Sequence, residues 1–147
     1  MNTATPTDGP GTWTLVVADR IHTLAGPPVK LVKEDQAWEG NLVEAPTLVR
    51  HGSQYTLFYS ANSYEGDKYV TGYATAYKLT GPYKKAPQPL LSTSTTGVIG
   101  PGGQDVVQGP GGADYLAVHG WDPAITHRSL YLLPLTWQGA QPVVKAR

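Results

Sequence analysis

The sequence contains no cysteine and few residues of several other kinds. Without cysteine there is neither a disulfide framework nor a thiolate nucleophile. Eleven lysine and arginine residues balance eleven aspartate and glutamate residues. This zero net charge gives no reason to expect nucleic acid or an anionic membrane surface as a partner. The small number of acidic residues also leaves few carboxylates for acid–base chemistry.

Long apolar segments are missing as well. No apolar run approaches the roughly 20 residues of a membrane-spanning helix, so we expect no membrane partner. The first residues, Met1 to Pro6, lack the basic and then apolar pattern of a secretory signal. The sequence therefore predicts a cytoplasmic protein, or one whose first residues were added in cloning.

Turn-forming and β-forming residues are abundant instead. The chain has 17 glycines, 13 prolines and nine tyrosines, but one methionine and one phenylalanine. Such a composition favours many short strands joined by turns, and no stretch shows sustained helical periodicity. The 147 residues suit a single domain. We expect a disordered leader over residues 1–11 and an all-β domain over residues 12–147.

The predicted strands fall into two groups that repeat one pattern. The first group would form one sheet from residues 46–51, 54–61, 68–77 and 82–85. The second would use residues 104–109, 114–120 and 128–137, with the last strand ending at Trp137. The segments that begin at Gln54 and Asp114 occupy matching places in the two groups. This similarity is typical of a radial repeat.

Glu44 is the leading candidate for chemistry. It lies just before Pro46, where an apolar run enters the predicted strands. Desolvation at the mouth of a buried strand raises the pKa of a carboxyl group towards the range that a general acid needs. Trp38 lies shortly before it and offers an aromatic surface on which a sugar ring could stack. The alternative is an ordinary exposed glutamate at the start of a strand.

Several segments resemble, in this order, the C-terminal half of the catalytic domain of family 43 glycoside hydrolases. They are Glu44-Ala45-Pro46, Gly100-Pro101-Gly102-Gly103-Gln104, Tyr115 to Trp121, and Arg128-Ser129-Leu130-Tyr131. The family holds β-xylosidases, α-L-arabinofuranosidases and arabinanases on a five-bladed β-propeller. The resemblance runs from about Leu24 to Trp137 and implies a partial propeller. At roughly 40–50 residues per blade, the chain would supply about three blades.

The resemblance implies hydrolysis, with inversion, of glycosidic bonds in arabinose- or xylose-containing plant oligosaccharides and polysaccharides. Glu44 would be the general acid. An inverting enzyme also needs a carboxylate base about 6.5–9.5 Å away, and the family's base and auxiliary aspartates precede the matching region. None of Asp8, Asp19, Asp35 and Glu39 stands in a matching context. We therefore expect the base to come from a missing or partner segment.

The resemblance also implies residues that bind the substrate. Arg128 and Asn62 would position the sugar, since the planar guanidinium suits hydrogen bonding to hydroxyl groups. Trp38 and Trp121 would be stacking surfaces. The alternatives are a surface ion pair for Arg128 and ordinary core positions for the two tryptophans.

Two residues are candidate metal ligands. His119 matches the family's histidine before a small residue and a tryptophan, and would ligate a metal or hold a water in the channel. Gln104 would offer oxygen to Ca²⁺, although Gly103 stands where the family's loop has a histidine. The resemblance implies that the reaction requires no cofactor, and that any Ca²⁺ would lie in the propeller channel. A core histidine is the alternative for His119.

An open stack of about three blades leaves sheet edges and an apolar face uncovered. We therefore expect the ring to be completed by a second copy, as a homo-oligomer, or by a complementing N-terminal chain. The expected small partner is a pentose-containing oligosaccharide. The alternative function, from a different class, is a non-catalytic carbohydrate-binding or self-assembling propeller fragment.

Overall fold

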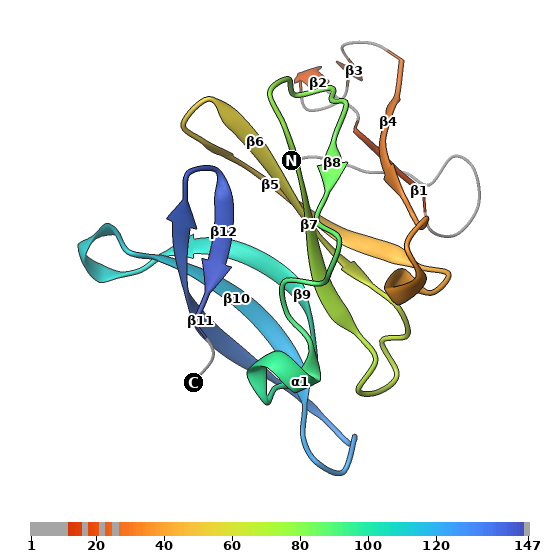
Figure 1. Cartoon of the computed structure of the whole chain (residues 1–147), viewed down its shortest axis with the longest axis vertical. Coiled ribbons are helices and arrows are strands. Elements are labelled where there is room, and N and C mark those ends of the chain that lie inside the picture. Colours follow the sequence, from red (N-terminus) through yellow and green to blue (C-terminus); the bar gives the residue numbers. More distant parts are fainter. Residues whose placement is uncertain (1–11, 16–17, 21–22, 25–26, 146–147) are drawn as a thin grey trace.

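The computed structural model describes residues 12–15, 18–20, 23–24 and 27–145, and these residues are mainly β-strands. They form two four-stranded sheets and two two-stranded sheets. Figure 1 shows the two larger sheets side by side, with the short N-terminal strands on the far side of the first. The sheets therefore follow one another across the molecule in the order of the sequence, as successive propeller blades do.

The first large sheet has the strand order β5 (Val43–His51), β6 (Gln54–Ala61), β7 (Val70–Ala76) and β8 (Lys84–Lys85). All its neighbouring strands are antiparallel, in agreement with the expected group of four. Smaller pairs precede it, and a short 3₁₀ helix, η1 (Ala37–Glu39), leads into it. These pairs join β1 (Thr12–Leu15) to β4 (Val29–Lys33), and β2 (Ala18–Arg20) to β3 (Thr23–Leu24).

The second large sheet has the order β12 (Gln141–Val144), β11 (Arg128–Gln138), β10 (Asp114–Trp121) and β9 (Ile99–Gln108). Short helices flank β9: α1 (Thr93–Thr96) before it and η2 (Pro110–Gly112) after it.

Two expectations for the second sheet are wrong. The sheet does not end at Trp137, because Gly139 takes a φ of 62° and turns the chain into β12. Pro142 obscures this strand in the sequence, but an edge strand accommodates a proline. In addition, β9 begins at Ile99, so the segment Gly100 to Gln104 is not a loop. It is an irregular part of the strand, with register shifts opposite β10.

The core lies on both faces of β6. Leu57 and Tyr59 point into one cluster, which packs against β4 and η1. Phe58 points to the opposite face, into a second cluster between the two large sheets. This alternation buries β6 completely from Thr56 to Ala61. The second cluster is completed by Leu91, Leu116, Val118, Leu133 and Leu135.

The all-β partial propeller expected from the sequence is confirmed, with each large sheet forming one blade. The predicted leader over residues 1–11 lies outside the described residues. Among the residues that are described, no helix has the length and apolar character needed to cross a membrane.

Candidate functional site

Glu44 lies at a β-bulge near the start of β5. It pairs with Ser60, whereas Thr47 pairs with Phe58, so β5 has one extra residue in this interval. Ala45 takes up the irregularity with a φ of 49°. A bulge of this kind changes the direction of the neighbouring side chains. The local sequence thus places a carboxylate at an irregular point of an otherwise regular sheet.

Tyr69 holds the carboxylate of Glu44. Its hydroxyl group donates a hydrogen bond of 2.6 Å to Oε1 of Glu44, and the residue is buried. Burial, followed by the hydrogen bond to Glu44, raises the pKa of Tyr69 well above its ordinary value, while Ser60 acts in the opposite sense. The phenol therefore stays protonated and remains a donor at neutral pH.

His119 stacks on one face of the Tyr69 ring. The two rings are nearly parallel, with an angle of 9° between their planes and 5.8 Å between their centroids. Burial and, to a lesser extent, Arg128 lower the pKa of His119, although Glu44 opposes the shift. The imidazole is therefore neutral at pH 7. Its Nδ1 atom is buried and has no hydrogen-bond partner within the described part of the chain.

A second group is built around Tyr64, on the loop between β6 and β7. Its carbonyl oxygen accepts hydrogen bonds from Trp121 Nε1, at 2.9 Å, and from Arg128 Nη2, at 2.6 Å. The Arg128 guanidinium lies 4.2 Å from the centre of the Trp121 ring, which is a cation–π contact. The Tyr64 ring meets Tyr69 edge to face, with 6.5 Å between centroids. This contact joins the second group to Glu44 and His119.

The loop between β10 and β11 keeps Trp121 and Arg128 paired. Asp122 accepts hydrogen bonds from the backbone of Thr126 and His127, at 2.6 and 2.9 Å. These bonds lower the pKa of Asp122 well below its ordinary value. Trp121 and Arg128, which flank this closed loop, are directly opposite each other in the sheet.

Four residues proposed from the sequence are therefore brought together: Glu44, His119, Trp121 and Arg128. The residue that links them, Tyr69, was not among the candidates. In the sequence it reads only as the first residue of a strand, and no local pattern connects it with a glutamate 25 positions earlier.

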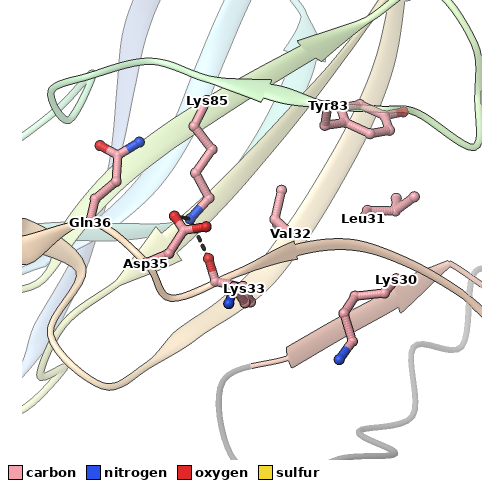
Figure 2. Close-up of a pocket in the computed structure, with 8 residues that line it drawn as sticks. All are labelled: Lys30, Leu31, Val32, Lys33, Asp35, Gln36, Tyr83 and Lys85. Carbon is pink, nitrogen blue, oxygen red and sulfur yellow. Dashed lines mark hydrogen bonds and ion pairs between the residues drawn. The ribbon is translucent and has the colours of Figure 1, made fainter.

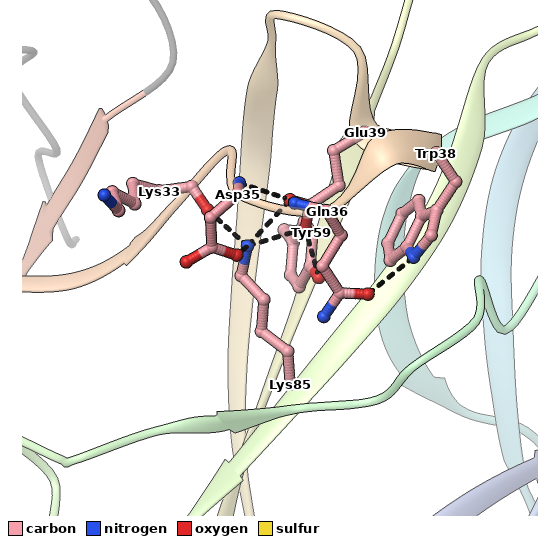
Figure 3. A network of polar contacts seen from close by, with 7 residues as sticks. All are labelled: Lys33, Asp35, Gln36, Trp38, Glu39, Tyr59 and Lys85. Carbon is pink, nitrogen blue, oxygen red and sulfur yellow. Dashed lines mark hydrogen bonds and ion pairs between the residues drawn. The ribbon is translucent and has the colours of Figure 1, made fainter.

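Trp38 and Asn62 form a separate group, shown in part in Figure 3. Trp38 stacks on Tyr59, with 6.1 Å between ring centroids, and packs against the first core cluster. Its indole nitrogen donates to Gln36. Asn62 donates to the carbonyl group of Trp38 and accepts from the backbone of Ser63. The packing of Trp38 favours its core interpretation, and Asn62 braces the loop through one N–H and one acceptor position of its amide.

Beside this group lies a hollow of about 370 Å³ between β4 and β8 (Figure 2). Lys85 reaches across it and binds Asp35 at 2.8 Å as well as the carbonyl oxygen of Lys33. The carboxylate of Asp35 is therefore paired with a cation. The hollow is lined neither by Glu44 nor by its hydrogen-bond partner Tyr69.

Gln104 is a structural link between the two sheets. Its amide oxygen accepts from Ser60 Oγ at 2.7 Å, and its amide nitrogen donates to the carbonyl oxygen of Ala45. Calcium requires six to eight oxygen ligands, and the oxygen of Gln104 is already occupied. Throughout the described ranges, no three histidine or acidic side chains gather in a cluster that could hold a metal ion. These residues do not fit a calcium site by themselves, and a metal at His119 stays a prediction.

Comparisons with known proteins agree with this architecture. A solved thermostable family-43 glycoside hydrolase is 27% identical, with a TM-score of 0.81 over 92% of this chain and 47% of its own. An endo-1,4-beta-xylanase from Bacteroides thetaiotaomicron is 26% identical, with a TM-score of 0.78 over 92% of this chain and 50% of its own. An alpha-L-arabinanase from Cellvibrio cellulosa, complexed with arabinohexaose, is 25% identical, with a TM-score of 0.71 over the same shares.

The chain thus spans about half the length of these solved structures. No curated protein sequence matches it significantly. The model of the family described as "Glycosyl hydrolases family 43" matches residues 6–141, which is most of the chain. The chain belongs to family 43 of the glycosyl hydrolases.

Proposed function

We propose that this chain supplies the general acid of a hydrolase that cleaves glycosidic bonds in arabinose- or xylose-containing plant oligosaccharides and polysaccharides, with inversion. The observation that carries the proposal is the carboxylate of Glu44, set at a bulge in a family 43 chain and held through one oxygen by Tyr69. The substrate class follows from the similar solved structures, which include a xylanase and an arabinanase with a bound arabinose oligomer.

In this mechanism Glu44 protonates the glycosidic oxygen as the bond to the sugar breaks. Arg128 hydrogen-bonds to the hydroxyl groups of the sugar. Trp121, which lies under the guanidinium, limits the positions that Arg128 can adopt. The uncharged ring of His119 packs against Tyr69 and forms one side of the site.

The carboxylate base comes from elsewhere in the assembled enzyme. An inverting reaction needs this second carboxylate about 6.5–9.5 Å from the acid, with space for the attacking water. In the described part of the chain, Asp35 and Glu39 bind Lys85, and Asp122 closes its own loop. Glu44 makes its hydrogen bond to Tyr69 and not to another acidic residue.

An outward face of the second sheet supports completion by further propeller blades. Leu130 and Leu132 on β11 are 73% and 50% exposed, on the side opposite the core residues Leu133 and Leu135. An apolar sheet face of this kind is expected to be covered. We propose that it packs against another blade, contributed by a second copy of the chain or by a complementing N-terminal segment.

The test combines light scattering with hydrolysis of nitrophenyl arabinofuranoside and nitrophenyl xyloside by the same sample. With arabinose and xylose oligosaccharides as substrates, whose sugar leaving group needs a proton, Glu44→Gln should reduce turnover to background, because glutamine cannot donate one, while binding of these oligosaccharides is nearly unchanged. Asp67→Asn, a change on an exposed loop, is the matched control and should leave turnover intact. Full activity in Glu44→Gln would contradict the assignment of the acid.

The exposed leucines favour one further candidate, a self-assembling or carbohydrate-binding fragment without catalysis. An oligomer that binds oligosaccharides but shows no turnover under any condition would support this second function.

A further inference from the structure

Tyr69 fixes one of the two carboxyl oxygens of Glu44. The hydrogen bond from its hydroxyl group to Oε1 is short, at 2.6 Å, as expected when the acceptor is a carboxylate. We propose that Tyr69 is a positioning residue, which anchors Oε1 and leaves Oε2 as the oxygen that carries the proton to be transferred. This inference rests on the proposed function, because it deepens the role of Glu44 as the acid.

The hydrogen bond from Tyr69 determines which oxygen of Glu44 carries the proton. In a neutral carboxyl group the carbonyl oxygen is a better acceptor than the hydroxyl oxygen, so the hydrogen bond that Tyr69 donates to Oε1 favours the proton on the other oxygen. The proton of the neutral acid therefore occupies Oε2. Within the described part of the chain, no hydrogen bond is recorded to Oε2 of Glu44. Because the Tyr69 phenol resists ionisation, it remains a donor to Oε1 throughout the neutral range.

The second sheet holds Tyr69 in place. The ring of His119, from β10, covers one face of Tyr69. Two successive glycines of β9 make room for these rings. A Cβ atom on Gly102 would lie 2.0 Å from the Tyr69 ring, and one on Gly103 would lie 2.4 Å from Nε2 of His119. A side chain at either glycine would therefore force one of these rings to move, and His119 contacts Tyr69 on the ring face.

The acid and its anchor therefore lie in one sheet, and the residues that support the anchor lie in the other. Glu44 is part of β5 and Tyr69 directly precedes β7, whereas the groups that seat Tyr69 come from β9 and β10. The packing of the two sheets thus sets the direction of one carboxyl group.

The chain offers a direct readout, because it has only four glutamates: Glu34, Glu39, Glu44 and Glu65. Labelling their side-chain carboxyl carbons with ¹³C gives four NMR signals, and Glu44→Gln identifies the signal of Glu44 by its disappearance. Tyr69→Phe keeps the ring and removes only the hydroxyl group. We expect it to shift the Glu44 signal and leave the other three in place.

Tyr59→Phe is the matched control. Tyr59 is also buried and donates to a glutamate, since its hydroxyl group binds Oε1 of Glu39 at 2.8 Å. This variant should shift the Glu39 signal and not that of Glu44. As a second measurement, Glu44→Gln in protein labelled at the tyrosine ¹³Cζ positions should shift the Tyr69 signal. The proposal is overturned if the Glu44 signal in Tyr69→Phe matches that of the unmodified chain, or if Glu44→Gln leaves the Tyr69 signal in place.

Kinetics separate this inference from the proposed function. In the active assembly, Tyr69→Phe should lower kcat by roughly 10- to 100-fold, the size expected for a misdirected catalytic group, with little change in KM. Unchanged kcat with full hydrolysis would refute the positioning role and keep the function. A shifted Glu44 signal in an assembly that hydrolyses no pentoside would keep the Tyr69 contact and refute the function.

Discussion

Replacing Lys85 with methionine should destabilise the chain by about 3–5 kcal/mol, the cost of removing one partner of a buried ion pair. Lys85 Nζ lies 2.7 Å from Oε1 of Glu39, and the two side chains are 9% and 0% exposed. Methionine retains most of the aliphatic stem, so the change isolates the charge. It leaves the Glu39 carboxylate buried without its cation.

The magnitude follows from the surroundings of Glu39 (Figure 3). Its carboxylate also accepts hydrogen bonds from the backbone of Asp35 and Gln36, both at 2.9 Å, and from the hydroxyl group of Tyr59. These donors hold Glu39 in place, so it cannot move to solvent when Lys85 is removed. An exposed ion pair would contribute only about 0–1 kcal/mol. For a chain of this size, each kcal/mol lowers Tm by about 2–4 °C, which gives a decrease of roughly 10 °C.

Urea unfolding followed by tryptophan fluorescence measures this loss. Lys84→Met is the matched control, because Lys84 is the adjacent residue of β8 and is exposed. It should change the free energy of unfolding by no more than about 0.5 kcal/mol. In the double variant with Glu39→Gln, the cost should be smaller than the sum of the two single changes, since the fully buried charge of Glu39 is also removed and only the half-exposed Asp35 loses its cation. A loss below about 1 kcal/mol in Lys85→Met would refute the reasoning.

Two further predictions concern the residues beside Tyr69. Burial lowers the pKa of His119 below its ordinary value of 6.5, so the unfolded chain binds this proton more readily and stability falls as pH decreases from about 6.5 towards the lowered pKa. His119→Phe should reduce this loss of stability, measured as the difference between the urea midpoints at pH 7.5 and pH 5.5. An unchanged difference between the midpoints would contradict the lowered pKa of His119. Gly103→Ala should cost more than Gly52→Ala, because both glycines have a φ near +60° but only at Gly103 would the Cβ atom meet another residue. Equal losses of the free energy of unfolding would show that His119 does not lie over Gly103.

The strands were predictable because their signals are local. Alternation such as that of Tyr55 to Tyr59, bounded by Gly52-Ser53, depends only on neighbouring residues. The bulge at Glu44 was not predicted, because the expected strand began at residue 46, whereas β5 begins at Val43 and includes Glu44. The strand β12 was missed because Pro142 resembles a strand end when its position at the sheet edge is unknown.

The site was only partly predictable, since its contacts join distant strands. The pairing of Tyr69 with Glu44 depends on the register of β5, β6 and β7 together, which no short segment encodes. Resemblance to a family placed Asn62 near the substrate, and the structure adds that one N–H and one acceptor position of its amide bind Trp38 and Ser63. A family position suggests where a residue lies, and hydrogen bonding then decides whether its side chain is available.

Sheet packing and the geometry of the acid are linked through Gln104. Its side chain joins Ser60 on β6 to the carbonyl group of Ala45, the residue directly after Glu44. Its own backbone carbonyl group accepts a hydrogen bond from Thr47, on the other side of the bulge. The bulge at Glu44 is thus held by the neighbouring blade and not by its own sheet alone. A buried glutamine that the sequence suggested as a metal ligand therefore explains why the irregular backbone beside the acid persists: the contact between blades stabilises it.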